Sequence, residues 1–263
     1  MTTLPRVAAV HDLSGYGRCS LTVVLPVLTA MGADCCPLLT AYLSSHTGFP
    51  GFTFADMTDR LNAVVDHWRQ LGLTFDALYS GFLGSARQID TVRRAVELFK
   101  PKIVLVDPVM GDHGRVYKTY TPEMCRAMRD LTGLATVVTP NLTEAAILLD
   151  LPCDTVPRDL SEARDWMTRL SQGRRDVVLT GMIENGRVLT LCGDRAIDRP
   201  FAGRAYHGTG DLFAGVALGH ILRGRPLCEA AEQAADFVWR AAEITATTDS
   251  ADIIFAPLMG RLV

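Results

Sequence analysis

Short apolar runs alternate with segments of helical periodicity along most of the chain. An apolar run bounded by polar or glycine residues is typical of a strand that is buried on both faces of a sheet. On this pattern we expect strands at Val7–Val10, Leu38–Leu43, Ala77–Ser80, Ile103–Val106, Thr136–Val138 and Val177–Leu179. The segments between them repeat apolar side chains at the spacing of an amphipathic helix. We expect helices at Cys19–Met31, Met57–Leu71, Ile89–Phe99, Thr143–Leu149 and Ala163–Leu170.

The last third of the chain breaks this alternation. Arg187–Cys192 and Ala196–Phe201 are strand-like and flank a Gly-Asp turn, which predicts an antiparallel hairpin at an edge of the sheet. Two helices follow, about Asp211–Leu222 and Leu227–Ala246. Together these patterns predict the α/β class, with a doubly wound, mostly parallel central sheet flanked by helices. Because no linker, repeat or shift in composition divides the chain, we expect residues 1–263 to form a single domain.

Composition narrows the class of protein. Of the 263 residues, 48% are hydrophobic and 21% are charged, and 26 Lys and Arg against 29 Asp and Glu give a net charge of −3. These values are typical of a soluble globular protein and offer no basic field for nucleic acid. The most apolar stretch, Val23–Leu43, is interrupted by two prolines, a glycine and an aspartate, which argues against a membrane span.

The first residues and the cysteines bear on location. Met1–Val10 is too short and too weakly apolar for a signal peptide. The seven cysteines lack the spacing of metal ligands, and Cys35 and Cys36 are adjacent, which is poor geometry for a shared metal. We therefore expect reduced thiols and a cytoplasmic protein.

The lysines exclude one common phosphate site. Only Lys100, Lys102 and Lys118 are present, and none follows a glycine-rich turn as the lysine of a Walker-type phosphate loop does. The Gly-x-Ser-x-Gly elbow of hydrolases and the complete dinucleotide fingerprint are also absent from the sequence. Any phosphate chemistry must therefore use arginine, backbone amides or a metal ion.

Polar and acidic residues gather just after the predicted strands, where ligands bind in open α/β sheets. The sharpest of these segments is Gly208-Thr209-Gly210-Asp211, which precedes a predicted helix. Its glycines permit a tight turn that exposes amides at a helix N-terminus, and such a turn attracts a phosphate or an oxyanion. Asp211 beside that anion site is suited to act as a general base toward a substrate hydroxyl. Asp is also a favoured helix cap, so the segment alone allows a purely structural interpretation.

Two further pairs of polar residues, three acids and one asparagine, follow neighbouring strands. Asp107 and Asp112 bracket a Pro-Val-Met-Gly turn and are suited to Mg²⁺, directly or through water, although a capped turn would use the same residues. Asn141 and Glu144 suit indirect metal and phosphate contacts, but they also match an N-cap with its capping-box acid. His46 can stack on or hydrogen-bond to a ring substrate, whereas a loop histidine is more often solvated.

These motifs resemble a known family. Gly208-Thr209-Gly210-Asp211, the Asp107–Asp112 turn and the Asn141-x-x-Glu144 pair are similar to those of the ribokinase-like superfamily. Within it, Ser45-His46-Thr47-Gly48-Phe49 and Thr139-Pro140-Asn141 resemble the pyridoxal (vitamin B6) kinases. The resemblance follows the same motif order from about His11 to the C-terminal helices.

The resemblance implies a ribokinase-like fold and ATP-dependent phosphorylation of the 5′-hydroxymethyl group of pyridoxal, pyridoxine or pyridoxamine. It implies Asp211 as the base, the Gly208–Gly210 amides as the anion hole, and Asp112 and Glu144 near Mg²⁺. It also implies a homodimer and a requirement for a monovalent cation such as K⁺. The implied ATP-binding residues are Asp107, Asp112, Tyr117, Asn141, Thr180, Thr209 and Gly210. The implied vitamer-binding residues are Ser14, His46, Thr47, Phe82 and Asp211.

Two positions depart from the family pattern. The loop His11-Asp12-Leu13-Ser14 differs from the serine-containing loop that contacts the pyridine ring, so the contact is open between Asp12 and Ser14. Phe82 stands where a tyrosine is typical. Both positions bear on which vitamer is preferred rather than on phosphoryl transfer.

Other functions fit the motifs less well. Hydroxymethylpyrimidine kinases of thiamin synthesis are similar but usually carry cysteine where Asp211 stands. Sugar and nucleoside kinases usually have an additional lid for which this chain is short. A non-catalytic B6-binding protein would be expected to lose the base or the acids, yet Asp107, Asp112, Glu144 and Asp211 are all present.

Overall fold

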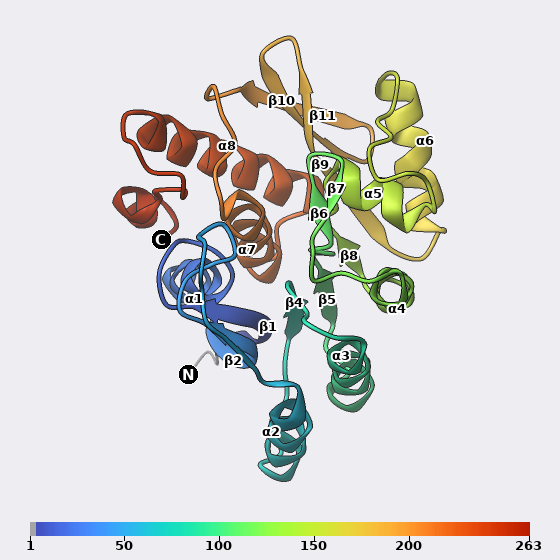
Figure 1. Cartoon of the computed structure of the whole chain (residues 1–263), viewed down its shortest axis with the longest axis vertical. Helices are drawn as coiled ribbons and strands as arrows, with labels where there is room; N and C mark the ends of the chain where they lie inside the picture. Colours follow the sequence, from blue (N-terminus) through green and yellow to red (C-terminus); the bar gives the residue numbers. More distant parts are fainter. Residues whose placement is uncertain (1–3) are drawn as a thin grey trace.

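A nine-stranded sheet runs through the computed structural model, which describes residues 4–263 (Figure 1). The strand order is β11-β10-β9-β8-β5-β4-β1-β2-β3, and the six strands from β9 to β2 are mutually parallel. The hairpin β10–β11 and the short β3 add antiparallel edges. The strands are β1 (Arg6–Ser14), β2 (Asp34–Leu43), β3 (Phe54–Asp56), β4 (Ala77–Ser80), β5 (Ile103–Val106), β8 (Val137–Val138), β9 (Asp176–Glu184), β10 (Arg187–Cys192) and β11 (Arg195–Pro200). A separate hairpin consists of β6 (Gly111–Asp112) and β7 (Arg115–Val116).

Helices cover both faces of the sheet (Figure 1). In β1, Val7 and Ala9 pack against α1 and α7, whereas Ala8 and Val10 face the core formed with α2 to α6. The alternation buries both faces of the strand, which explains its continuous apolar run. The helices are α1 (Leu21–Ala30), α2 (Thr58–Gln70), α3 (Ala86–Phe99), α4 (Pro122–Thr132), α5 (Leu142–Leu148), α6 (Leu160–Ser171), α7 (Thr209–Leu222), α8 (Leu227–Ala246) and a final 3₁₀ helix (Ala256–Arg261).

The predicted doubly wound, mostly parallel sheet with an antiparallel edge hairpin is confirmed. β4, β5, β10 and α8 have the predicted bounds, and α7 begins two residues before the predicted start at Asp211. The sequence patterns did not reveal α4, β3, β6, β7 or the 3₁₀ helix. All three β3 residues are exposed, so that strand lacks an apolar face, and β6 and β7 are two residues each.

The expectation of reduced thiols is wrong for one pair. Cys192 and Cys228 form a disulfide that joins the end of β10 to the first turn of α8. The two residues are 36 positions apart, and no spacing motif marks the pair in the sequence. The other five cysteines are free thiols: Cys19, Cys35, Cys36, Cys125 and Cys153.

The arrangement of the parallel strands positions the site, since their carboxyl ends meet at one edge. β1 lies between β2 and β4, so the chain crosses from one side of β1 to the other after β2. Such a reversal leaves a crevice outside the strand ends, the usual ligand site of this class. Within residues 4–263, none of the helices is both long enough and apolar enough to cross a membrane.

Candidate active site

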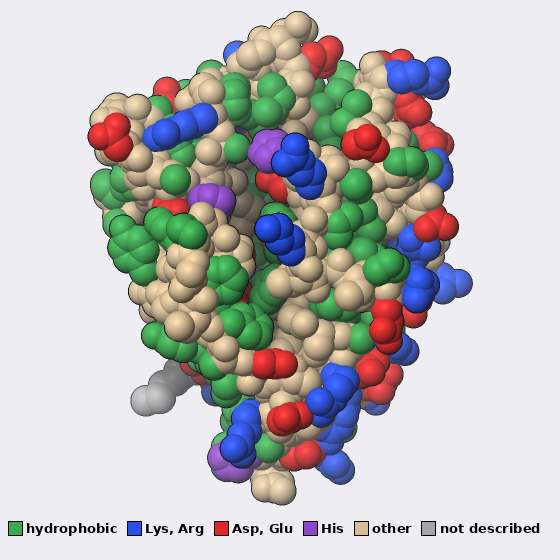
Figure 2. Space-filling model, in the orientation of Figure 1, with side chains coloured by type: hydrophobic (Ala, Val, Ile, Leu, Met, Phe, Trp, Pro, Cys, Tyr) green, Lys and Arg blue, Asp and Glu red, His purple; other side chains and the backbone are tan. Residues whose placement is uncertain are grey.

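A cavity of about 330 Å³ opens at the carboxyl ends of β5, β8 and β9. Figure 2 shows the hollow near the middle of one face, with histidine and cationic side chains at its rim. The structure brings together at this cavity every residue proposed above for ATP, metal and the anion hole: Asp107, Asp112, Tyr117, Asn141, Glu144, Thr180, Gly208, Thr209, Gly210 and Asp211.

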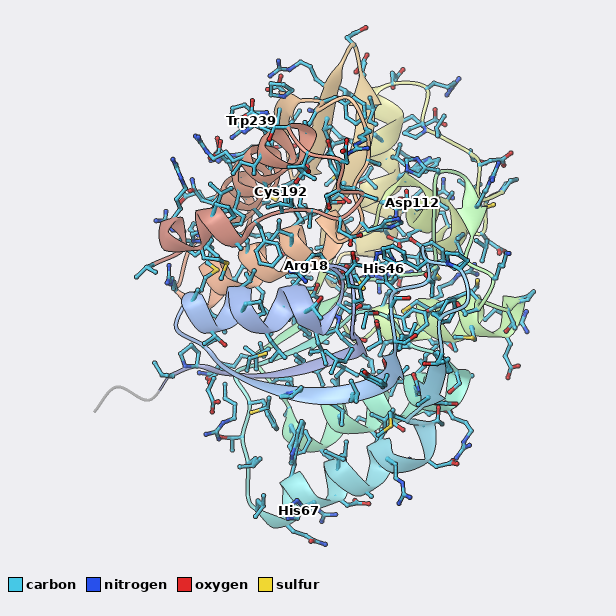
Figure 3. All side chains as sticks on the ribbon, turned by 60° about the vertical axis from the view of Figure 1, so that its left-hand side comes forward. Arg18, His46, His67, Asp112, Cys192 and Trp239 are labelled. Carbon is cyan, nitrogen blue, oxygen red and sulfur yellow. A yellow bond between two sulfur atoms is a disulfide. The ribbon has the colours of Figure 1, made fainter. Side chains whose placement is uncertain are left out.

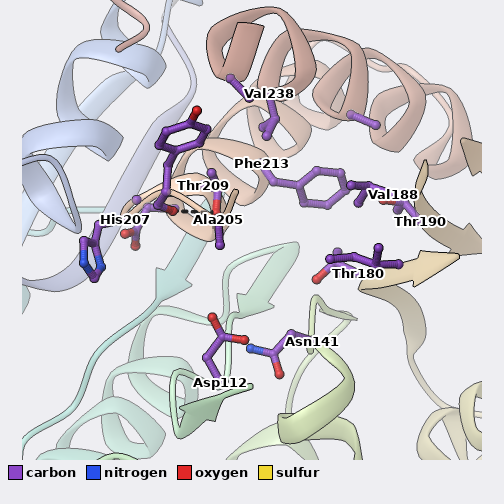
Figure 4. Close-up of a pocket in the computed structure, with 18 of the residues that line it drawn as sticks. Asp112, Asn141, Thr180, Val188, Thr190, Ala205, His207, Thr209, Phe213 and Val238 are labelled. Atoms are coloured by element: carbon purple, nitrogen blue, oxygen red, sulfur yellow. Dashed lines mark hydrogen bonds between the residues drawn. The ribbon is translucent and has the colours of Figure 1, made fainter. Parts of the chain in front are cut away.

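The glycine turn before α7 presents backbone amides to this cavity. Gly208 is the N-cap of α7 and has φ +83°, a left-handed conformation that favours glycine. A Cβ atom at Gly208 would lie 2.1 Å from the carbonyl oxygen of Arg18, so a side chain is also excluded by contact. The Thr209 hydroxyl donates to the Tyr206 carbonyl (3.1 Å), a bond drawn in Figure 4. Because the N-cap Gly208 has no side chain to cap the helix, the first amides of α7 can donate to a ligand.

Asp211 lies in the first turn of α7 with its carboxylate largely buried. Its Oδ2 accepts a hydrogen bond from the Ser20 amide (2.8 Å), and its Oδ1 is 4.0 Å from Nδ1 of the buried His11. Burial raises the pKa of Asp211 to about 7, although the Ser20 amide opposes that rise by stabilising the charged form. A carboxyl group with this pKa is suited to accept a proton near neutral pH.

Three more carboxyl groups line the cavity, and Asp107 is the one nearest the α7 turn. Asp107 is 6% exposed, and burial together with the charge of Asp211 raises its pKa to about 8. Glu144 is 4% exposed, and burial and the charge of Asp107 raise its pKa. Asp112, on the β6–β7 hairpin, is half exposed. The charges acting on the buried acids are those of other carboxylates, so this part of the site is suited to a cation.

Asn141 and Glu144 form the capping box that starts α5. The Asn141 side chain accepts from the Glu144 amide (3.0 Å), and the Glu144 carboxylate accepts from the Asn141 amide (2.9 Å). The structural interpretation of this pair is thus confirmed. Asn141 also donates to the Gly111 carbonyl (2.9 Å), which ties the β6–β7 hairpin and its Asp112 to the start of α5.

The far end of the cavity is apolar and was not predicted. Figure 4 shows Phe213 and Val238 across the cavity from Asp112 and Asn141. These walls come from α7, α8 and β10, for which the sequence predicted the elements but no site. The disulfide ties β10 to α8 outside this wall. The apolar and small lining residues here are Val188, Thr190, Phe213, Ala235, Val238, Trp239 and Ala242.

The structure leaves the predicted vitamer residues Ser14, His46, Thr47 and Phe82 outside the lining of this cavity. Ser14 is buried and donates to Asp12 (3.2 Å), Thr47 is exposed, and the Phe82 carbonyl accepts from Thr40 (3.0 Å). These three lie at strand exits or loops beside it, and their role stays a prediction.

His46 is held by the protein rather than by solvent. Its Nε2 is 2.7 Å from Oδ1 of Asp252, and its Nδ1 accepts from the Gly48 amide (3.1 Å). The residue is 6% exposed, and its ring packs at a tilt against His207, a lining residue of the cavity, with 4.6 Å between ring centroids. A Cβ atom at Gly17 would lie 2.1 Å from the His46 ring, which places His46 beside the loop that carries Arg18 (Figure 3). Both ring nitrogens are engaged, so His46 shapes the edge of the site through His207 and offers the substrate only its ring.

The sequence model of the phosphomethylpyrimidine kinase family matches residues 26–253. The chain belongs to this family. It is 31% identical to the pyridoxine/pyridoxal/pyridoxamine kinase of Bordetella avium, over 94% of this chain and 88% of the relative.

Solved structures give the same result. A protein of Bacteroides thetaiotaomicron assigned to the phosphomethylpyrimidine kinases, crystallised with pyridoxal, is 36% identical with a TM-score of 0.92, covering 99% of this chain and 96% of that one. Pyridoxal kinase from Lactobacillus plantarum is 30% identical with a TM-score of 0.92, covering 99% and 97%. These comparisons confirm the predicted resemblance to B6 kinases of the ribokinase-like superfamily.

Proposed function

We propose that this protein transfers the γ-phosphoryl group of ATP to the 5′-hydroxymethyl group of a B6 vitamer. The observation that carries the proposal is the position of Asp211, whose largely buried carboxylate lies in the first turn of α7 beside the amides of Gly208–Gly210. A base next to an anion-binding turn is what the attack of a hydroxyl on a phosphoryl group requires. The names of the Bordetella and Lactobacillus relatives support pyridoxal, pyridoxine or pyridoxamine as the acceptor.

In this proposal Asp211 accepts the proton of the attacking hydroxyl. The amides of Gly208–Gly210 and the positive end of the α7 dipole stabilise the charge on the transferred group. The apolar end of the cavity, around Phe213 and Val238, holds the adenine ring, and Tyr117 and Thr180 lie along the nucleotide between the two ends. The protein mainly fixes reactants in line and supplies charge, because phosphoryl transfer needs little covalent chemistry from the enzyme.

The acids suit Mg²⁺. Asp107, Asp112 and Glu144 offer only oxygen donors, and burial raises the pKa values of Asp107 and Glu144, so a bound cation would stabilise their ionised forms. In residues 4–263, no three His, Cys, Asp or Glu side chains are placed to hold a metal ion by themselves. We infer that Asp112 and Glu144 bind the ion and that water and phosphate oxygens complete its coordination, as is common for Mg²⁺. When bound, Mg²⁺ neutralises charge on the phosphates.

The vitamer is expected beside Asp211, at the carboxyl ends of β1 and β4. Ser14 or Asp12 on β1 and Phe82 after β4 then approach the pyridine ring. Thr47 and the ring of His46 come from the loop after β2. The exposed position of Thr47 leaves it free to contact a ligand, whereas the hydroxyl of Ser14 is already bonded to Asp12.

Phosphorylation of a hydroxymethylpyrimidine is the second candidate. The description of the matching family favours it, and so does the assignment of the Bacteroides protein. Asp211 argues for the B6 vitamers, because the hydroxymethylpyrimidine enzymes usually have cysteine at this position.

A substrate panel separates the two candidates. Purified protein with Mg-ATP is incubated with pyridoxal, pyridoxine, pyridoxamine, hydroxymethylpyrimidine and a sugar, and the products are identified by mass spectrometry. We expect a 5′-phosphate from at least one B6 vitamer at a higher kcat/KM than for the pyrimidine. Exclusive reaction of hydroxymethylpyrimidine would reassign the substrate, and the lack of any phosphorylated product would reject the kinase proposal.

We propose a homodimer and a monovalent cation requirement on the resemblance to related kinases. The cytoplasmic location stays a prediction from the N-terminal residues and the cysteines, and the Cys192–Cys228 disulfide counts against the second of these grounds. Size-exclusion chromatography with light scattering tests the homodimer. Replacing K⁺ by Na⁺ in the assay tests the cation. The near-neutral charge, with no basic surface pattern in the sequence, supports small-molecule partners rather than nucleic acid or membrane.

A further inference from the structure

Ser20, the residue before α1, has an unusual backbone conformation. Its φ is 50° and its ψ is −130°, a combination that glycine adopts readily and that costs other residues about 1–3 kcal/mol. The residue is 5% exposed, so surrounding groups hold it in place. Strain of this kind persists only where the neighbouring structure imposes it, and it is concentrated at functional sites.

The hydroxyl of Ser20 does not serve the helix it precedes. At the starts of α3, α4, α5 and α6, the side chain of the N-cap accepts a hydrogen bond from an amide of its own helix. At α1 the Ser20 hydroxyl instead donates to Oδ1 of the buried Asp12. The side chain is thus used to fix the backbone of residue 20, not to cap α1.

The backbone that is fixed in this way contacts the proposed base. The Ser20 amide donates to Oδ2 of Asp211 at 2.8 Å, across 191 positions of sequence. Two residues earlier, the Arg18 carbonyl lies where a side chain at Gly208 would be. The loop before α1 and the turn before α7 therefore meet at two points, the Ser20 amide on Asp211 and the Arg18 carbonyl against Gly208.

We infer that Ser20 is a positioning residue for Asp211: its amide orients the carboxylate toward the reacting hydroxyl, and its bond to Asp12 holds that amide in place. The inference rests on the proposed role of Asp211 as the base. Ser20 takes no part in the proton transfer, and the bond from its hydroxyl to Asp12 serves to hold its backbone.

Several charged or titratable groups face Asp211 and bear on its proton affinity. These are His11 and Asp12 on β1, Cys19 before α1, Tyr79 on β4 and Asp107 after β5. The Ser20 amide is the one hydrogen-bond donor to the Asp211 side chain recorded in residues 4–263. Loss of its alignment should therefore disfavour the ionised carboxylate.

Two substitutions at one position separate positioning from folding. Ser20→Ala loses the bond to Asp12 and keeps a Cβ atom that disfavours the left-handed backbone. We expect kcat to fall roughly 10- to 100-fold, with KM for ATP and vitamer within about three-fold, as for a misplaced catalytic group. The ascending limb of the pH profile of kcat/KM should also move to higher pH. Ser20→Gly loses the same bond but adopts the conformation freely, so it should recover most of kcat.

A control at another helix tests whether the loss in Ser20→Ala comes only from a weakened helix N-terminus. Ser85 is the N-cap of α3 and does accept a bond from its helix. Ser85→Ala should lower Tm and leave kcat and the pH profile unchanged. The inference is overturned if Ser20→Ala keeps the wild-type kcat, if the loss lies in KM alone, or if Ser20→Gly is as impaired as Ser20→Ala. Asp211→Asn is measured alongside: if it retains turnover, the proposed base is wrong, whereas an inactive Asp211→Asn with a fully active Ser20→Ala rejects only the role of Ser20.

Discussion

Burial of carboxyl groups is the main physical feature of the site at the scale of single residues. Asp107, Glu144 and Asp211 lie within one cavity, and burial is the largest cause of the raised pKa of each. Moving an acid out of water disfavours its charged form, and neighbouring carboxylates add to this effect. Groups in this state gain most from a bound cation, and one of them has a pKa near the pH at which a base must work.

The pKa of Asp211 predicts how the rate depends on pH. A base must be ionised, and this carboxyl is protonated below about pH 7. We therefore expect kcat/KM for the vitamer to rise roughly tenfold per pH unit below pH 7 and to level off above it. The measurement is a rate profile at saturating Mg-ATP, with both pyridoxal and pyridoxine so that ionisation of one substrate is not mistaken for that of the enzyme. A profile that is flat from pH 5.5 to 8.5 would contradict the assignment.

Some site residues could be predicted from the sequence and others could not. Asp107, Asn141 and Asp211 follow strands or begin a helix, and the fold rule places all such positions at one edge. Ser20 and Asp252 have no such marker. Their contacts, to Asp211 and His46, span 191 and 206 residues and arise only once the sheet has formed.

At the scale of elements, α7 is the helix on which the site depends. Both of its ends carry a glycine in the left-handed conformation: Gly208 at the start (φ +83°) and Gly224 after the end (φ +82°). Their surroundings differ. A Cβ atom at Gly208 would contact the Arg18 carbonyl at 2.1 Å, whereas none of the described residues lies within 4 Å of one at Gly224.

This pair gives a matched test of the glycine turn. Gly224→Ala should cost only the backbone strain, about 1–2 kcal/mol of unfolding free energy, and keep kcat. Gly208→Ala adds a collision with backbone, so it should destabilise more and lower kcat at least roughly tenfold by displacing the anion-binding amides. Chemical denaturation and steady-state rates of both variants provide the measurement. Equal effects of the two substitutions would show that the contact with Arg18 does not hold the turn.

β3 and the β6–β7 hairpin, which the sequence did not reveal, share a physical cause. All three β3 residues are exposed, so the strand has no buried apolar side, and the hairpin is held by backbone pairing and by Asn141 rather than by an apolar face. α4 is different, because it buries Met124, Met128 and Leu131 and was missed although it has an apolar face. Hydrophobic periodicity detects only elements that bury a face. The apolar end of the cavity was missed for another reason: in the sequence, the residues of β10 and α8 that line it look like ordinary core positions.

At the scale of the whole molecule, the parallel sheet gathers buried carboxyl groups at one edge, and this affects the free energy of unfolding. An acid whose pKa is raised by folding binds a proton more tightly in the folded state, so stability falls as pH rises from the unfolded pKa to the folded pKa. Asp107 is raised from 3.8 to about 8. His11, lowered from 6.5 to about 3, acts in the opposite direction but only below pH 6.5.

We therefore expect the ligand-free protein to lose roughly 2 kcal/mol of unfolding free energy between pH 6.5 and pH 8. Denaturant titrations at several pH values measure the loss. Glu144→Gln keeps a capping-box acceptor at the start of α5 and removes one acid, so it should flatten the dependence, and Mg-ADP should do the same in the wild type. A wild-type protein whose stability rises over this pH range would contradict the burial of these acids.

On this fold, Asp211 is expected to act as the base in phosphoryl transfer to a B6 vitamer. The most direct measurement is the single-turnover rate of 5′-phosphate formation by the wild type and by Asp211→Asn, at saturating Mg-ATP and pyridoxal. The prediction is a rate lower by roughly 10²- to 10⁴-fold in Asp211→Asn, with the affinities for both ligands within about three-fold of wild type. A wild type that forms no 5′-phosphate, or an Asp211→Asn variant within about tenfold of its rate, would contradict it.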